Sequence, residues 1–385
     1  MLNHRRTSKT PAFSLIIIHI MQQKNLYRTK KNSGVILVVV VWILLILTIL
    51  AIGVGRMTTI EIALTNYSLG QLRAKYMAWA GVFYAINLIQ KDTADKTTSQ
   101  FDSLYQCAVS LDQNDAASFT KIFKNIALEE RFFCISYPKK NPDADREQEW
   151  YGFTDEERKI NLNALTPENY LILRRLLINL GVEDATARTI AASVIDWKDA
   201  DDQITNGSFG AEDAYYQGLK PPYHCKNMPF DNVEELLLVK GMTLKILEQL
   251  KDYVTVFPKD SSALLINLNT ASGLVIQSVA ESLSGVSTNT EMSDAKSLSD
   301  KIIAYRAGSD LQIMTKDDRL IELNDMGLNP KETAIFLSLQ RYVTRVSRYI
   351  RVMVQGVDNS SKAQSKMEAV IDRNTLSILS WRSNH

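Results

Sequence analysis

The sequence has few of the residues that build metal-bound or covalent reaction centres. Its 385 residues include only three cysteines, Cys107, Cys134 and Cys225, which form no CxxC pair, and four scattered histidines. This excludes a zinc ribbon, whose ligands come in closely spaced pairs. The signatures HExxH, GxxxxGK[ST] and GxSxG are absent as well. The sequence therefore predicts no enzymatic activity.

Acidic residues are missing from the N-terminal segment. Residues 1–34 contain seven Lys and Arg and no Asp or Glu, whereas the rest of the chain contains 37 bases and 43 acids. The slightly acidic remainder opposes a role in binding nucleic acid, because such proteins normally carry a basic patch or stripe. The overall composition is otherwise that of a globular protein, and the length allows two or three domains.

A run without charge follows the basic segment. From Val35 to Gly55, 21 residues carry no charged side chain, and only Thr48 is polar before Ile52. A helix of this length crosses a hydrocarbon core of roughly 30 Å, whereas a strand this long would be abnormal. The bases at residues 24–31 precede the run. The positive-inside rule therefore predicts a cytoplasmic N-terminus, a single membrane pass and a body on the other side.

A cleavable secretory signal is the alternative interpretation. Its apolar region would be only about 7–15 residues long and would end at a small-residue cleavage site. Here the run is longer, and an apolar pattern with helical spacing continues through Ile60, Leu64 and Tyr67 to Ile86. Residues 35–90 also contain no proline. The sequence predicts one long helix, half inside the bilayer and half outside it.

The start of this helix resembles the type IV pilin-like class. In that class a basic leader ends in Gly, here Gly34 after Lys30-Lys31-Asn32-Ser33, and the apolar helix begins at once, here with Val35. The resemblance implies cleavage after Gly34 by a prepilin peptidase and methylation of the new amino group of Val35. The Glu usual at the fifth mature position is replaced by Val39. Minor pseudopilin K of the type II secretion system characteristically lacks this acid.

The last part of the chain is expected to form strands. Alternating residues over 349–355 and the following segments 365–372 and 375–381 are separated by turn-forming residues. This pattern predicts a small antiparallel sheet.

Residues 160–340 show the spacing of helices instead. Thr166-Pro167 and Asp184 are expected helix starts. The phrase Ile160-Asn161-Leu162-Asn163-Ala164 recurs 106 residues later as Ile266-Asn267-Leu268-Asn269-Thr270-Ala271. Each copy is followed by a Gly-Met or Met-Gly turn. The sequence predicts two related helical subdomains.

This order of elements resembles the minor pseudopilin K family over roughly residues 30–385. The supporting motifs are Asp196-Trp197-Lys198-Asp199-Ala200-Asp201, Gly210-Ala211-Glu212-Asp213, Tyr223, Asn227, Glu235-Leu236 and Asn267-Leu268-Asn269-Thr270-Ala271. The resemblance implies an α+β fold: a pilin-like long N-terminal helix, a small antiparallel β-sheet and a large inserted all-α domain. The expected parts are a leader at 1–34 with Met21 as the favoured true start, a spine helix at 35–92, a pilin-like α/β domain from 93–159 plus 341–385, and the inserted helical domain at 160–340.

The resemblance also implies the function. A minor pseudopilin K is a nonenzymatic subunit at the tip of the periplasmic pseudopilus, anchored in the inner membrane, and it helps to start assembly with minor pseudopilins I and J. The alternative is a membrane-anchored helix-hairpin-helix receptor for DNA uptake, suggested by the Asn-Leu-Asn phrases. The hairpin at Leu176–Asp184 offers one Gly and no base, and the body is acidic, so no nucleic acid is expected as a partner.

A cluster of acids is the main candidate site. Residues 196–213 contain a single base, Lys198, and six acids, which are Asp196, Asp199, Asp201, Asp202, Glu212 and Asp213. Ca²⁺ prefers about six to eight oxygen ligands, several of them carboxylates. The spacing Asp199-x-Asp201-x-Gln203 copies the first three ligand positions of an EF-hand loop. The copy then fails, because Ile204 and Gly210 stand where Gly and Glu are needed.

Two other interpretations of this cluster are open. The acids form either a solvated loop or, at Asp196 and Glu212, a paired-carboxylate acid and base. The family resemblance favours Ca²⁺, because members of the family hold calcium in this region. The expected side-chain ligands are Asp199, Asp201, Glu212 and Asp213, with Gln203 helping through a carbonyl. Asp196 is a further candidate that is also placed to end the preceding helix, and Asp202 is expected to face solvent.

Two cysteines are candidates for a disulfide. Cys107 and Cys134 would lie in the oxidising periplasm, where disulfides persist. Two buried thiols are an equally good interpretation, and Cys225 has no evident partner.

The expected processing site gives the first testable prediction. A Gly at the cut site adds no side chain and allows unusual backbone dihedrals, so Gly34→Leu should leave the leader attached and block assembly. N-terminal sequencing and mass spectrometry of the wild-type protein should find an N-methylated Val35. A mature N-terminus near Gly55, or an uncut leader in the wild type, would contradict the prediction.

Overall fold

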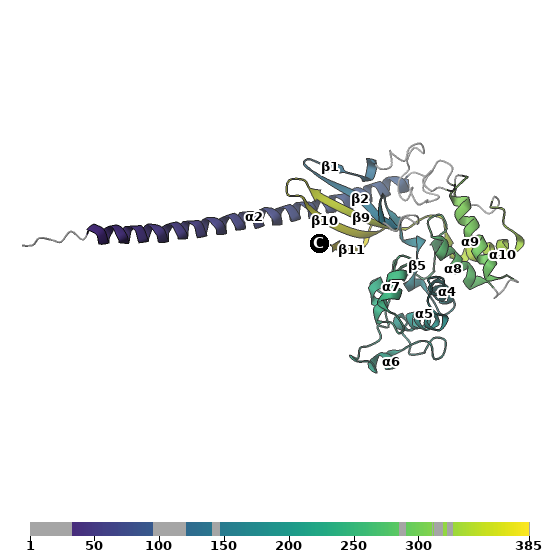
Figure 1. Ribbon diagram of the computed structural model, residues 1–385. Helices are drawn as coiled ribbons and strands as arrows, with labels where there is room; N and C mark the ends of the chain where they lie inside the picture. Colours follow the sequence, from purple (N-terminus) through teal and green to yellow (C-terminus); the bar gives the residue numbers. More distant parts are fainter. Residues whose placement is uncertain are drawn as a thin grey trace, which may run out of the picture. The chain divides into compact units, whose positions relative to one another are not determined.

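The computed structural model describes residues 33–94, 121–140, 147–284, 290–309, 311, 319–321 and 326–384. The chain divides into two units, residues 1–66 and 67–385, which are described separately. The predicted α+β class is confirmed, because a long N-terminal helix, an antiparallel sheet and a helical region are all present (Figure 1).

The long helix α2 spans Ser33–Ala94. In the first unit its described side chains, from residue 34 to 66, are all exposed. By length and composition this part is able to cross a membrane. Its threonines Thr48, Thr58 and Thr59 donate their hydroxyls to carbonyls one turn earlier in the helix. These polar side chains therefore need no partner outside the helix, as a hydrocarbon environment requires.

In the second unit the same helix is amphipathic. Its buried face packs on the sheet and consists of small and medium apolar side chains: Ala74, Met77, Ala78, Val82, Ala85 and Ile89. Asp92, in the last turn of the helix, forms a buried ion pair with Arg373 in the turn after β10. The end of α2 is thus fixed to the sheet by both apolar packing and charge.

The sheet joins strands from both sides of the helical region in the order β1-β2-β9-β10-β11. Its members are β1 (Ile126–Leu128), β2 (Arg131–Lys140), β9 (Tyr349–Asp358), β10 (Ala363–Asp372) and β11 (Ile378–Asn384), with β3 (Glu147–Tyr151) on β2 and β4 (Thr154–Asp155) on β9. All pairs are antiparallel. The three predicted C-terminal strands are present. The first extends three residues further because it continues into the hairpin with β10, and the last begins at Ile378 because residues 373–377 form the turn and its exit.

Glycines allow α2 to approach the sheet closely. A Cβ atom on Gly356 of β9 would lie under 3.0 Å from the backbone of Ala74 and Ala78 in α2. From the helix side, a Cβ atom on Gly81 would collide with Val354 and Phe133. The helix and the central strands therefore meet partly through backbone atoms, which leaves no room for side chains.

The helical region lies between β4 and β9. Its helices are α4 (Leu171–Asn179), α5 (Asp184–Lys198), α6 (Asp213–Gln217), α7 (Leu244–Leu250), α8 (Gly273–Leu283), α9 (Met292–Arg306) and α10 (Pro330–Leu339), with 3₁₀ turns η1 (Glu156–Arg158), η2 (Leu162–Ala164), η3 (Val233–Leu238) and η5 (Gln340–Tyr342). The expected helix start at Thr166-Pro167 is too early, because residues 167–170 form a turn and the α-helix begins at Leu171. The start at Asp184 is confirmed.

The region is not purely helical. It also contains two parallel pairs of two-residue strands, and each pair joins the start and the end of one half of the region. These pairs are β5 (Ile160–Asn161) with β6 (Val254–Thr255), and β7 (Ile266–Asn267) with β8 (Val343–Thr344). These pairs were not predicted from the sequence, because two residues are too few to show an alternating pattern.

The repeated Asn-Leu-Asn phrases adopt the same local structure. Asn161 and Asn267 each accept a hydrogen bond, 3.0 Å long, from the backbone N–H two residues later. In each copy two helices follow, and a glycine with positive φ, Gly241 or Gly327, comes two residues before the cap of a further helix. Between the second helix and that glycine lie 42 residues in the first copy and 20 in the second. The first copy therefore carries a larger insertion, which contains α6.

The close contact between α2 and β9 predicts a large effect of Gly356→Ala. Overpacking commonly costs about 1–3 kcal/mol, and here the added methyl group meets backbone rather than a side chain that is able to turn away. The melting temperature of the full chain in detergent, followed by circular dichroism, should fall clearly.

Gly273→Ala is the matched control. The nearest atom to its added Cβ is 3.4 Å away, so the melting temperature should stay the same or rise slightly. Equal melting of Gly356→Ala and wild type would show that the helix and the strand are not in close contact.

Candidate functional site

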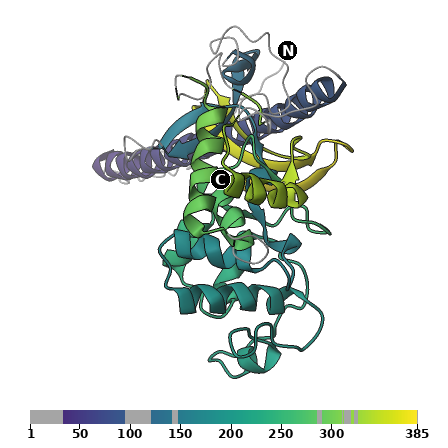
Figure 2. The same ribbon diagram turned by 90° about the vertical axis from the view of Figure 1, so that its right-hand side faces the viewer.

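The insertion in the first repeat contains most of the acidic cluster. It begins at Asp199, the C-cap of α5, and includes Glu212, the N-cap of the short helix α6. Figures 1 and 2 place α6 and its flanking loops at the outer end of the helical region. The site thus lies on the loop that connects the end of α5 to the start of α6.

Three carboxylates converge in this loop. One oxygen from each of Asp199, Asp201 and Glu212 lies within 4.8 Å of the other two. These residues are half-buried, exposed and buried, respectively. Three acids at such distances repel one another unless a cation or protons compensate their charge.

Several oxygens of this group have no hydrogen-bond partner among the described residues. Oδ1 of Asp199 and both carboxylate oxygens of Glu212 are buried without a hydrogen bond from any described residue. Glu212 is only 6% exposed. Burial and the neighbouring acids raise the pKa of Glu212 to about 7 and that of Asp199 to about 6. Unpaired buried carboxylates are costly, so the geometry favours a bound cation.

The single base of the cluster does not compensate these charges with an ion pair. Lys198 donates from its ammonium group to the carbonyl of Asn163, 3.2 Å away. Within the described part of the chain, none of the three grouped carboxylates forms a salt bridge. The negative charge of the group is therefore left for a ligand.

Asp196 shapes the loop instead of joining the three carboxylates. Its two carboxylate oxygens accept hydrogen bonds from the backbone N–H groups of Thr205, at 2.8 Å, and Ala211, at 2.6 Å. Gly210 lies against this carboxylate, and a Cβ atom there would collide with it. The requirement for Gly210 explains why the EF-hand pattern is broken at that position.

The other proposed ligands lie outside the group of three. Asp213 accepts hydrogen bonds from the backbone of Cys225, at 2.8 Å, and contacts Nδ1 of His224 at 3.1 Å. The backbone N–H of Gln203 donates to Asp201, 2.8 Å away. Asp202 is exposed, as expected. The roles of Asp213, Gln203 and Asp196 as ligands stay predictions.

Two further polar groups near the loop belong to Trp197 and Asn227, which the sequence showed as motif residues but did not predict to take part in the site. Oδ1 of Asn227 and Nε1 of Trp197 are buried and have no hydrogen-bond partner among the described residues. Asn227 has a positive φ of 49° and donates its backbone N–H to the carbonyl of Trp197, 2.9 Å away. Asn is one of the few residues other than Gly that often adopt a positive φ, so an Asn at this position is a usable sequence feature. Because Asn227 is distant from the acids in the sequence, its position near them was not predicted.

The donor set of the group fits a hard cation. All three side chains offer carboxylate oxygens, which suit Ca²⁺ or Mg²⁺, and the group contains no His or Cys, which softer metals prefer. Asp199, Asp201 and Glu212 would hold the ion, and the ion would compensate their negative charge.

The cysteines give no test of the predicted disulfide. Cys107 lies outside the described residues. The thiol of Cys134 is buried, donates to Oδ1 of Asn125 at 3.2 Å, and accepts from the backbone N–H of the same residue. Cys225 is buried and donates to the carbonyl of Asp196, 3.4 Å away. The pairing of Cys107 with Cys134 stays a prediction.

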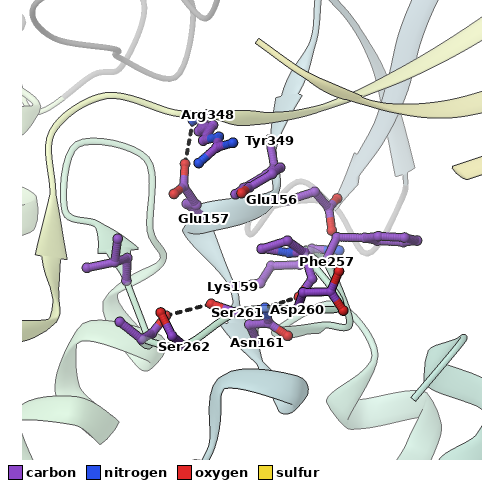
Figure 3. Close-up of a pocket in the computed structure, with 13 residues that line it drawn as sticks. Glu156, Glu157, Lys159, Asn161, Phe257, Asp260, Ser261, Ser262, Arg348 and Tyr349 are labelled. Atoms are coloured by element: carbon purple, nitrogen blue, oxygen red, sulfur yellow. Dashed lines mark hydrogen bonds between the residues drawn. The ribbon is translucent and has the colours of Figure 1, made fainter. Parts of the chain in front are cut away.

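A separate pocket of 220 Å³ lies where the helical region meets the sheet (Figure 3). Two acids that line it, Glu156 and Glu157, are bound to other parts of the chain. Glu156, fully buried, pairs with Arg351 of β9 and accepts from the hydroxyl of Thr255, and Arg351 holds the pKa of Glu156 far below its usual range despite the burial. Glu157 accepts a hydrogen bond of 2.5 Å from the backbone of Arg348. These contacts identify the pocket as a joint between the two parts.

Comparisons with known proteins agree with the fold and the motifs. A family model described as type II secretion system (T2SS), protein K matches residues 158–259. The chain is 27% identical over 256 residues to type II secretion system protein K of Aeromonas hydrophila, which covers 63% of this chain and 68% of that protein. It is 28% identical over 252 residues to the protein of the same name from Klebsiella pneumoniae, which covers 62% and 67%.

A solved structure has the same fold. It is the crystal structure of the GspK-GspI-GspJ complex from the type II secretion system of enterotoxigenic Escherichia coli, matched with a TM-score of 0.58 at 16% identity. The match covers 83% of this chain and 99% of that chain. The matched segment at residues 158–259, the relatives of the same name and the shared fold together make this chain similar to the type II secretion system protein K family.

Proposed function

We propose that this protein is the minor pseudopilin at the tip of the type II secretion pseudopilus, where it helps to initiate assembly together with minor pseudopilins I and J. The observation that carries the proposal is the exposed apolar face of α2 in the second unit. The sheet covers one face of this helix, and the other face carries a row of large apolar side chains that a neighbouring subunit would cover.

This row follows helical spacing. Leu72, Tyr76, Trp79 and Phe83 are between 39% and 62% exposed, and they succeed one another at steps of four, three and four residues. Trp79 is held in place by Trp381 of β11, whose ring centroid is 5.0 Å away. Contiguous exposed apolar side chains of this size mark an interaction surface, and their spacing suits a helix of another subunit.

Two further features favour a position at the tip. Val39 replaces the acid that in the pilin-like class is thought to neutralise the amino terminus of a neighbouring subunit within the membrane, where an unpaired charge is costly. A subunit with no other subunit above it has no need of this acid. The helical region of about 180 residues would also obstruct packing inside the shaft of a filament.

The proposed location is the inner membrane, with a cytoplasmic N-terminus and a periplasmic body. The apolar part of α2 and the bases that precede it support this orientation. Cleavage by a prepilin peptidase after Gly34 and methylation of Val35 belong to the same proposal.

The interaction surface supplies the test of the function. Replacing Tyr76 and Phe83 together by Ser removes two exposed aromatic side chains without opening a cavity, so the protein should still fold. We expect it to lose copurification with minor pseudopilins I and J from detergent-solubilised membranes, and secretion should fall at least tenfold.

Leu337→Ser is the matched control, because Leu337 is 56% exposed on α10, away from the row. This variant should retain both the partners and secretion. Full copurification of the Tyr76→Ser/Phe83→Ser variant would contradict the interaction surface. A gold label on the protein that recurs along the shaft would contradict the position at the tip.

We further propose that the group of Asp199, Asp201 and Glu212 binds Ca²⁺. The support comes from the three converging carboxylates, from the buried Glu212 oxygens that no described residue satisfies, and from the lack of an ion pair to them within that part of the chain. Mg²⁺ is expected to bind less well, because it releases its water reluctantly and demands octahedral geometry.

Calcium should therefore stabilise the full chain in detergent. A cation that binds only the folded state at a hundred times its Kd adds about 2.7 kcal/mol, which corresponds to a rise in melting temperature of roughly 5–10 °C for a domain of this size. Glu212→Gln should abolish most of the rise, because the amide keeps the shape and removes the charge.

The matched control is Asp202→Asn, since Asp202 is an exposed acid of the same loop outside the group of three. It should keep the calcium effect. Equal stabilisation of the wild type and Glu212→Gln by calcium would mean that the acids form only a solvated loop.

A further inference from the structure

One lysine from another part of the helical region contacts the acidic loop on both sides of Glu212. Lys240 precedes Gly241 in the turn that leads to α7. Its ammonium group donates to the carbonyl of Gly210, 2.9 Å away, and to that of Ser208, 3.4 Å away. The acidic segment just before Glu212 is thus attached to the turn before α7.

The same lysine also contacts the segment after Glu212. Its ammonium group lies 4.9 Å from the ring centroid of Tyr215, and its backbone N–H donates to the hydroxyl of Tyr216, 3.3 Å away. Tyr216 is fully buried and packs edge-on against Trp197 of α5. Lys240 therefore connects both sides of Glu212 to the packed core of the first repeat.

We infer that Lys240 is the positioning residue of the proposed cation site. It holds the loop on either side of Glu212, so that the Glu212 carboxylate lies close to those of Asp199 and Asp201. This inference rests on the proposed binding of calcium. The ammonium group satisfies carbonyls rather than carboxylates, so it orders the loop without occupying the place of the ion.

The physical reason is preorganisation. Ordering a loop at the moment of binding reduces affinity, whereas a loop that is already held binds its ligand without that cost. Hydrogen bonds from a charged donor are stronger than neutral ones, and the carbonyl of Gly210 lies only two residues before Glu212. Removing the ammonium group should therefore weaken the binding of calcium more than it alters the fold.

The second repeat provides a matched lysine. Lys301 donates to the carbonyl of Gly327, the glycine that corresponds to Gly241, at 3.1 Å, and pairs with Glu332 at 2.6 Å. It makes a similar contact between an ammonium group and a carbonyl but is far in the sequence from the acids of the first repeat. Substituting Lys301 therefore distinguishes a general loss of stability from a specific loss of cation affinity.

The test is calcium titration of the full chain in detergent by isothermal titration calorimetry. Lys240→Met, which keeps most of the stem of the side chain, should bind Ca²⁺ roughly tenfold more weakly than wild type because the charged hydrogen bonds are lost. Lys240→Arg should recover part of the affinity, since it restores a charged donor. Lys301→Met should lower the melting temperature and leave calcium affinity unchanged.

The outcomes separate this inference from the proposal it rests on. A wild type that binds no Ca²⁺ would refute the calcium site itself. A wild type that binds, with Lys240→Met binding equally well, would overturn the role of Lys240 and leave the calcium site intact. An equal loss of affinity in Lys301→Met would also overturn it, because the effect would then follow stability alone. If Lys240→Met fails to fold, the calcium affinity and melting temperature of Lys240→Arg are compared with those of the wild type instead.

Discussion

The contact between the backbone of α2 and the central strand β9 is the constraint on which the second unit depends. Gly356 allows the carbonyl of Ala74 and the N–H of Ala78 to lie where a side chain would otherwise stand. From the helix side, Gly81 makes room for the side chains of Val354 and Phe133. This contact fixes the distance between helix and sheet. The apolar row from Leu72 to Phe83 is then left on the opposite face of the helix, where another subunit is able to reach it.

The joint between the sheet and the helical region has a different chemistry. Three consecutive acids, Asp155, Glu156 and Glu157, each contact a different part of the chain: Thr270 of the second repeat, Arg351 of β9 and the backbone of Arg348. Buried charges of this kind stabilise little in net terms but are very costly to leave unpaired. They therefore specify one way of joining the two parts, and the charges in the pocket of Figure 3 serve this purpose.

How well the sequence predicted these features depends on how far apart in the sequence the contacting residues lie. The length of α2 and the C-terminal strands followed from local periodicity, and the helix start at Asp184 followed from capping chemistry. The convergence of Asp199 and Asp201 with Glu212 was predicted, because these residues stand close in the sequence around one loop. Local pattern was not sufficient for Asp196, whose carboxylate binds two backbone N–H groups of the loop, or for Lys240 and Asn227, which approach the site through the tertiary fold.

The insertion of the helical region between β4 and β9 has a consequence for the order in which the protein folds. Asp155 of β4 pairs directly with Ile350 of β9, so the helical region leaves and re-enters the sheet at neighbouring positions. The strands β9, β10 and β11 all follow the helical region in the chain. As the chain is made from its N-terminus, the face of α2 that packs on Gly356 lacks its central strand until residues some 270 positions later are made. The helix and the central strands of the sheet can thus join only after the whole helical region has been made.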